Sequence, residues 1–190
     1  VLIAVDTLRA CRLGLYGHER ATSKHVDRLA RESLVFDHAI APAPWTTPSF
    51  AGILTGRHPG EMGIGYDPVP LPDGIPTLAE ELKRRGYATA GIVSHFFIGT
   101  KFGFHRGFDF WDQRHSGGHD TISSDGVSHL ALGCLKSLKE SGRPFFLFAH
   151  YFDPHYDYLA HREFPFFEGY EGELHSGSDN FEELRAMARK

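Results

Sequence analysis

The segment from Trp45 to Arg57 places hydroxyl side chains at the start of an expected helix. Pro48 suits the first turn of a helix, where its missing N–H costs nothing, and Thr46 or Thr47 is placed to act as the N-cap residue. Unpaired backbone N–H groups and the positive end of the helix dipole favour a phosphate or sulfate group at such a position. The segment predicts a hydroxyl nucleophile beside an anion-binding helix terminus. An ordinary capped helix is the alternative.

A carboxylate directly follows the N-terminal apolar run. Residues 1–5 are Val-Leu-Ile-Ala-Val, and Asp6 comes next. A continuous β-branched run is typical of a parallel strand that is covered on both faces. Open α/β sheets bind ligands at the carboxyl ends of their strands, so Asp6 is a candidate metal ligand. The sequence also allows Asp6 to cap the following turn.

Histidine is abundant, and most of the 13 histidines fall in expected loops or on polar faces. His155 is the strongest candidate, because it follows a strand end and a proline. His150 is either a site residue or a satisfied core residue at the end of the same strand. Asp153 is expected either to orient His155 or to cap the turn.

Several stretches together resemble the sulfatase branch of the alkaline phosphatase superfamily. Residues 6–17 and 46–57 carry the Asp-Thr-Leu-Arg and Thr-Thr-Pro-Ser segments that resemble its metal and nucleophile regions. Residues 86–94 and 103–112 look like that family's next strand and following loop. Residues 144–155 look like the strand that ends in its active-site Pro-His. The matches cover nearly the whole chain in the family's order, which is far more specific than any one of them.

The resemblance implies an α/β fold, a mostly parallel sheet sandwiched by helices, in which a divalent metal ion polarises a sulfate or phosphate ester. Thr46 takes the nucleophile position and, with Asp6, contacts the metal, whose identity (Ca, Mg, Zn or Mn) stays open. His155 binds the anionic oxygens or helps the leaving group. The remaining positions carried over are His95 as a catalytic residue and Ser49, Ser94 and Arg57 as substrate-binding residues.

The nucleophile position departs from the family pattern. Sulfatases carry Cys or sometimes Ser there, which is oxidised to formylglycine, whereas Thr46 cannot be converted to that aldehyde. An unmodified Thr is what the phosphodiesterase and phosphotransferase relatives use, and a metal-activated alkoxide is a competent nucleophile at phosphorus. The favoured hypothesis is a metal-dependent hydrolase of sulfate or phosphate esters. A phosphoryl-group transferase on the same fold and a non-catalytic binding remnant are the alternatives.

Other departures concern the ligands around the nucleophile. Phe50 stands where the family has an arginine, and Cys11 stands where close relatives carry an aspartate. The family's downstream Asp-His-Gly segment does not occur between Val1 and Lys190. We therefore expect residues 1–190 to be the N-terminal portion of a single sulfatase-like catalytic domain. We also expect this portion to have little or no activity alone, because a hard cation needs several ligands.

The elements that must position these residues alternate along the chain, as expected for a parallel sheet with helices on both faces. Val127, Leu130, Leu135 and Leu138 should face the sheet from one of the helices. Thr77 and Glu80 form a capping box. Strands are expected at 1–5, 34–40, 87–93 and 145–149; helices at 23–34, from 46, before 86, at 121–139 and at 179–189; and loops at 68–76, 96–119 and 156–177.

Composition excludes little. The net charge is −4 and the basic residues are scattered, so no nucleic-acid partner is expected. Two cysteines, Cys11 and Cys134, fit neither a disulfide framework nor a zinc motif. No signal peptide or membrane-length apolar run is present, which says nothing about export; the resemblance is compatible with a periplasmic or extracellular location. The expected partner is a small-molecule, glycan or lipid ester of sulfate or phosphate, and membrane association and oligomeric state stay open.

Overall fold

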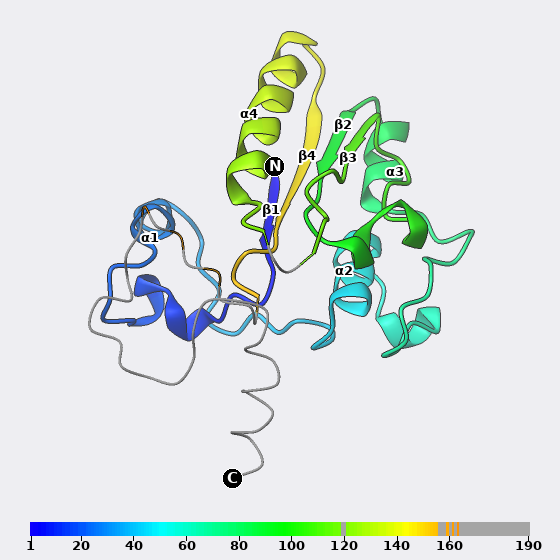
Figure 1. Cartoon of the computed structure of the whole chain (residues 1–190). Helices are drawn as coiled ribbons and strands as arrows, with labels where there is room; N and C mark the ends of the chain where they lie inside the picture. The colour runs from blue at the N-terminus through cyan, green and yellow to red at the C-terminus, as the bar shows by residue number, and fades with distance from the viewer. Residues whose placement is uncertain (119–120, 156–158, 160, 162, 164–190) are drawn as a thin grey trace.

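The computed structural model describes residues 1–118, 121–155, 159, 161 and 163, and a parallel sheet lies at its centre (Figure 1). This part of the chain forms a four-stranded sheet in the order β1-β4-β2-β3, with every neighbouring pair parallel. The strands are β1 (Leu2–Val5), β2 (Ala88–Ile92), β3 (Phe110–Asp112) and β4 (Phe145–Tyr151). The α-helices are α1 (Lys24–Ala30), α2 (Thr46–Thr55), α3 (Leu78–Arg84) and α4 (Ser124–Glu140). The predicted α/β fold class is confirmed.

The central strand β4 alternates its side chains between two hydrophobic cores. Phe146 and Phe148 pack into a core shared with side chains of α2 and α3. Leu147 and Ala149 pack on the other face, against side chains of α4. Figure 1 shows α4 on one side of the sheet and α2 and α3 on the other. Because successive strand residues point to opposite faces, an all-apolar strand is buried on both.

Several sequence predictions are confirmed. Thr77 and Glu80 form the expected capping box, with the Thr77 hydroxyl accepting from the Glu80 N–H and the Glu80 carboxylate accepting from the Thr77 N–H. Residues 68–76 form a loop. Val127 and Leu138 of α4 are buried against the sheet, with Leu130 and Leu135 packed beside them. Both cysteines are free, and Cys134 is partly buried in the α4 core.

The segment predicted as a loop at 96–119 contains regular structure within its described residues 96–118. These residues form the 3-10 turns η4 (Phe96–Ile98) and η5 (Thr100–Phe102) and then strand β3. A strand of three residues is too short to show a period-two pattern, so sequence periodicity did not indicate it. The other 3-10 turns are η1 (Ala10–Arg12), η2 (Gly14–Tyr16) and η3 (Pro59–Met62).

The N-terminal part of the chain departs most from the predictions. Strand β1 is not covered on both faces, because Ile3 is 63% exposed at the edge of the sheet. The strand predicted at 34–40 is wrong: Leu34 and Ile40 are 81% and 90% exposed in a turn-rich segment. A strand needs a neighbouring strand to pair with, and the described residues bring none to this segment.

Two helices account for the remaining differences. Helix α1 begins after Ser23 as predicted, but none of its residues is buried, so its predicted apolar face is exposed. The N-cap of α2 is Trp45 with no side-chain cap, so the prediction that Thr46 or Thr47 caps this helix is wrong. Both hydroxyls donate to distant acceptors instead. The helix predicted at 179–189 lies outside the described residues, as does most of the segment 156–177.

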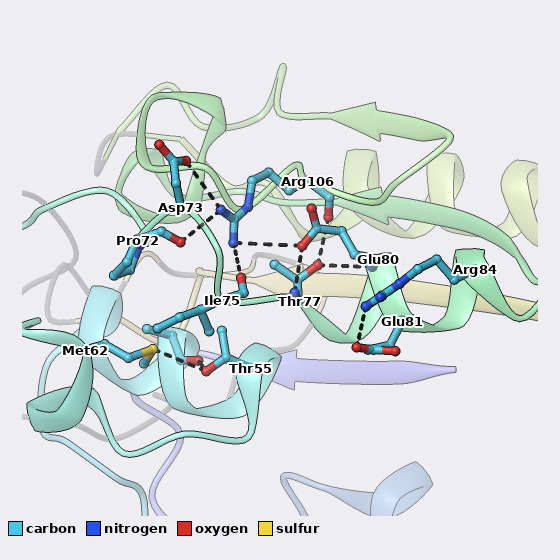
Figure 2. A network of polar contacts seen from close by, with 11 residues as sticks. Thr55, Met62, Pro72, Asp73, Ile75, Thr77, Glu80, Glu81, Arg84 and Arg106 are labelled. Carbon is cyan, nitrogen blue, oxygen red and sulfur yellow. Dashed lines mark hydrogen bonds and ion pairs between the residues drawn. The ribbon is translucent and has the colours of Figure 1, made fainter.

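Arg106 holds the loop 68–76 against the turn that precedes β3 (Figure 2). Its guanidinium donates to the carbonyl oxygens of Pro72 at 3.1 Å and Ile75 at 2.6 Å. It also pairs with Asp73 at 3.8 Å and Glu80 at 3.9 Å. Because guanidinium presents several donors in one plane, this one side chain can bind two carbonyl oxygens of the loop at once.

Candidate active site

The register of β1 and β4 brings Asp6 and His150 together at the carboxyl end of the sheet. Ala4 is paired with His150, and the Asp6 N–H continues the ladder by donating to the Tyr151 carbonyl at 2.8 Å. Side chains two residues apart on a strand share a face, so Asp6 lies on the same face as Ala4. This is the face that α2 covers.

Helix α2 begins at this face and places Thr46 against the carboxylate. The Thr46 hydroxyl donates to Asp6 Oδ2 at 3.3 Å, and His150 Nε2 lies 3.4 Å from the same oxygen. The His150 side chain is fully buried and that of Asp6 is 10% exposed. One turn along α2, Phe50 packs edge-on against the His150 ring, with centroids 5.0 Å apart. Asp6, Thr46 and His150 form what we call the Asp6 cluster.

The environment of the Asp6 cluster keeps the carboxylate ionised. Burial alone raises the pKa of Asp6. The hydrogen bond with His150, together with electrostatic attraction to His150, His95 and His155, outweighs burial, and the pKa of Asp6 lies below its ordinary value of 3.8. At neutral pH Asp6 is therefore an acceptor for the Thr46 hydroxyl and a negatively charged oxygen donor for a cation.

Two of the predicted catalytic histidines adjoin this cluster. His95 follows β2 and lies with its ring centroid 6.5 Å from that of His150. The Phe152 ring stacks on both His95 and His155, with centroids 4.3 Å apart in each pair, and the two imidazole centroids are 6.2 Å apart. The structure thus brings Thr46, Asp6, His95 and His155 to one edge of the sheet.

Contacts across the sequence fix the turn that carries His155. The Asp153 carboxylate accepts hydrogen bonds from the N–H groups and hydroxyls of both Ser123 and Ser124 at the start of α4. Burial opposes ionisation of Asp153, but these four bonds keep its pKa below 3.8. The Thr7 hydroxyl donates to the Pro154 carbonyl at 2.7 Å. These contacts give Asp153 a role that the sequence did not indicate, as a cap of a helix whose N-cap residue lies 30 residues earlier in the chain.

The predicted substrate-binding residues are placed less uniformly. Ser94 is buried, and its hydroxyl donates to the His150 carbonyl at 2.9 Å, so it links β2 to β4. Ser49 lies one turn along α2 from Thr46 and is half-buried. Arg57 is exposed just beyond Gly56, the C-cap of α2, so the ten-residue helix separates it from Thr46. The structure does not bring Arg57 to the Asp6 cluster.

The donors of the Asp6 cluster match a hard divalent cation in type but not in number. Asp6 and Thr46 supply oxygens, which Mg²⁺ and Ca²⁺ prefer. Within the described residues, however, no group of three or more His, Cys, Asp or Glu side chains is arranged to hold a metal ion. These residues can make only part of a metal site.

His150 is the site residue that the sequence left undecided. Its position at the end of a buried strand fitted a core histidine equally well, and only its distance to Asp6 distinguishes the two. A sequence signal for His150 was available. Two parallel strands that both end in a polar residue place those residues at the same edge of the sheet.

Comparison with known proteins agrees with the resemblance. The family model described as Sulfatase matches residues 1–185. Human arylsulfatase A is 40% identical over 120 residues, covering 57% of this chain and 23% of the relative. Mouse steryl-sulfatase is 38% identical over 110 residues, covering 52% of this chain and 18% of the relative. The matched part thus spans about a fifth of the length of these relatives.

Solved structures share the fold. The structure of Ps i-CgsB superimposes with a TM-score of 0.78 at 20% identity, over 90% of this chain and 49% of that one. The phosphonate monoester hydrolase of Agrobacterium radiobacter superimposes with a TM-score of 0.66 at 19% identity, over 83% of this chain and 41% of that one. The helices of the described residues include none with the length and apolar character to cross a membrane.

Proposed function

Because the chain belongs to the sulfatase family, we propose that it carries the nucleophile of a metal-dependent hydrolase of sulfate or phosphate esters. The observation that carries this proposal is the shared oxygen of the Asp6 cluster: Asp6 Oδ2 lies 3.3 Å from the Thr46 hydroxyl and 3.4 Å from His150 Nε2. A hydroxyl held by an ionised carboxylate at a helix N-terminus is oriented toward the place where the helix favours an anion.

The residues take distinct roles in the proposed reaction. The Thr46 oxygen attacks sulfur or phosphorus as its proton passes to Asp6, the bond to the leaving alcohol breaks, and His155 gives that alcohol a proton, which His155 regains from the water of the second step while Thr46 regains its own from Asp6. Water then hydrolyses the Thr46 ester. Asp6 orients the hydroxyl and is a weak base, because its pKa is lowered. His150 in turn holds Asp6.

A divalent ion fits this arrangement as a cofactor. We propose Asp6 and Thr46 as two of its oxygen ligands, with the other ligands outside the described residues. When bound, such an ion lowers the pKa of a hydroxyl and neutralises anionic oxygens of the ester. The family model and the ionised state of Asp6 support this proposal.

The identity of the nucleophile favours phosphorus over sulfur. Oxidation of a threonine side chain yields a ketone, so Thr46 cannot give the aldehyde on which sulfatases with Cys or Ser rely. An unmodified alkoxide is a competent nucleophile at phosphorus. The same argument supports a phosphoryl-group transferase as the second candidate, since an acceptor alcohol can replace water in the second step. Phe50, which stands where the resemblance places an arginine and packs against His150, supports a non-catalytic remnant as the third candidate.

We propose residues 1–190 as the N-terminal portion of one sulfatase-like catalytic domain with little activity alone. The matched part of the chain covers 18% and 23% of the length of two relatives, which supports this proposal. The incomplete set of metal donors around Asp6 supports it as well. Relatives named for steroids and for sulfated sugars support a small-molecule, glycan or lipid ester as substrate, and a neighbour named as a periplasmic domain supports export.

The test compares 4-nitrophenyl phosphate and 4-nitrophenyl sulfate, each with and without added divalent metal. It is run on the 190-residue chain and on the product of the reading frame that encodes it. We expect metal-dependent release of nitrophenol from the longer product, abolished by Thr46→Ala and strongly reduced by Asp6→Asn. An added acceptor alcohol separates transfer, which yields a new ester, from hydrolysis.

Thr47→Val is the matched control. Thr47 is the neighbouring threonine, fully buried, and its hydroxyl donates to the Phe97 carbonyl at 3.1 Å. This variant perturbs the same turn of α2 without removing the proposed nucleophile. The folded variant should therefore keep its activity. Equal rates for Thr46→Ala and the unsubstituted protein would refute the role of Thr46. Absence of metal binding and of turnover in the longer product would favour the remnant.

A further inference from the structure

A continuous row of aromatic rings runs from the surface to the candidate site. Tyr66 stacks on Trp45 with centroids 5.3 Å apart and planes 24° apart, and Trp45 contacts Phe97 at 5.5 Å. Phe97 contacts His95 at 5.3 Å. His95 then begins the stack with Phe152 and His155 described above. We call Tyr66, Trp45 and Phe97 the aromatic wall.

The aromatic wall joins the Asp6 cluster directly. Trp45 is the N-cap of α2 and therefore precedes Thr46 in the chain. The Phe97 carbonyl accepts the Thr47 hydrogen bond, which fixes the wall to the first turn of the same helix. The aromatic wall therefore lies beside the position proposed for the anionic group of the ligand.

The outer end of the wall is open to a ligand. Tyr66 is 80% exposed although it is stacked on an indole. The buried indole N–H of Trp45 has no hydrogen-bond partner among the described residues. Aromatic faces beside a few unspent polar groups are typical of small-molecule sites. A core contact alone would bury the outer ring, whereas this one presents it to solvent.

We propose that the aromatic wall is a subsite that binds a flat, apolar ring face of the ligand, with Tyr66 and Trp45 as its specificity-determining residues. It rests on the proposed function in that the ring belongs to the alcohol part of the ester. Two kinds of ring present such a face, an aryl group and the C–H face of a pyranose. Stacking on an aromatic side chain contributes about 0.5–1.5 kcal/mol beyond buried area, which corresponds to as much as about tenfold in Kd.

The test measures ring binding without turnover. The protein is titrated with three probes, and saturation-transfer NMR measures the binding of the two that carry a ring. The probes are 4-nitrophenol as the aryl probe, methyl β-glucopyranoside as the sugar probe and inorganic sulfate as the ringless probe. At least one ring probe should bind the 190-residue chain, and Tyr66→Ala should weaken it up to about tenfold. Phe36→Ala removes another exposed ring, away from the wall, and should leave binding unchanged. Circular dichroism checks that each variant is folded.

Each outcome decides the inference. Binding of the aryl probe or the sugar probe, weakened by Tyr66→Ala alone, supports the subsite and identifies which ring it takes. No ring binding, or binding that Tyr66→Ala leaves intact, overturns it. Thr46→Ala should abolish turnover by the longer product but keep ring binding, because the probes carry no ester. Turnover by the longer product without ring binding refutes only the subsite, and ring binding with no turnover by the longer product refutes only the proposed function.

Discussion

His150 is a fully buried polar side chain, and its Nε2 contacts the carboxylate of Asp6, a side chain that is only 10% exposed. Taking a carboxylate out of water costs several kcal/mol unless a partner compensates it. His150, on a rigid central strand, supplies that compensation at the place where the proposed nucleophile is held. At the scale of single residues, stability and chemistry therefore depend on the same pair.

We expect His150→Leu to lower the free energy of unfolding at pH 7 by about 2–3 kcal/mol. Leucine keeps most of the volume of the ring but leaves the Asp6 carboxylate buried with less compensation. Urea unfolding followed by circular dichroism measures the change. His25→Leu on the exposed surface of α1 is the control, with an expected change within about 0.5 kcal/mol. Equal stabilities for the two variants would contradict this account of His150.

Asp153 gives a prediction for pH. Because its pKa is lowered in the folded protein, the charged form contributes stability at pH values above its unfolded pKa near 3.8. That contribution is lost as the pH falls through the lower folded value. Asp153→Asn should therefore cost about 2 kcal/mol at pH 7, where four hydrogen bonds to a charged acceptor are weakened. Urea titrations at pH 7 and at pH 3 should show the difference from the unsubstituted protein shrinking; a constant difference would contradict the charge argument.

At the scale of elements, α3 packs closely on the turn that precedes β3. A Cβ atom at Gly107 would lie 2.2 Å from the Glu80 nitrogen and 2.6 Å from the Ala79 carbonyl carbon, both backbone atoms of α3. Backbone cannot move aside as a flexible side chain can. This close approach, together with the Arg106 contacts, sets the distance between the helix and the sheet edge.

Gly107→Ala tests that close approach against a matched glycine. Gly74 has the same φ of +84° but open space where its Cβ would be. Gly74→Ala should therefore cost only the left-handed conformation, about 1 kcal/mol, whereas Gly107→Ala should cost about 3 kcal/mol because steric overlap is added. Thermal unfolding of both variants measures the difference. Equal losses would show that α3 shifts freely on the sheet.

At the scale of the whole molecule, the strands of the sheet are unequally covered. The inner strands β4 and β2 are buried against the helices, whereas Ile3 and Val5 of β1 are exposed at the edge of the sheet. Within the described residues, β1 pairs only with β4, so its outer edge presents unpaired backbone groups there. Exposed apolar strand edges promote association with other chains.

We expect the 190-residue chain to self-associate through β1 at micromolar concentration. Ile3→Lys should reduce this, because a charge on an edge strand opposes edge-to-edge pairing. Sedimentation velocity over a concentration series measures the association. Leu132→Lys adds the same charge on the exposed face of α4, where Leu132 is 68% exposed, and should have little effect. Association that is equally weakened by both substitutions would assign it to net charge and not to β1.

Sequence patterns succeeded where the cause of structure is local or where burial is complete. The Thr77–Glu80 capping box, the strand around Ala88–Ile92 and the apolar run Phe145–Ala149 follow from neighbouring residues or from an apolar pattern that only a doubly covered strand has. The motifs also placed Asp6, Thr46 and His155 in one family pattern. The sequence prediction was wrong at residues 34–40, where an apolar pattern predicted a strand that the structure does not form.

Tertiary structure decided which polar atoms meet. Asp6 and His150 are 144 residues apart, and Thr46 and Asp6 are 40 apart, so no local pattern could give their shared contact. The capping of α4 by Asp153 and the aromatic wall are of the same kind. Helix caps and apolar periodicity depend on atoms a few bonds or one turn away, whereas the site depends on strand order and register, which the packing of the whole chain determines.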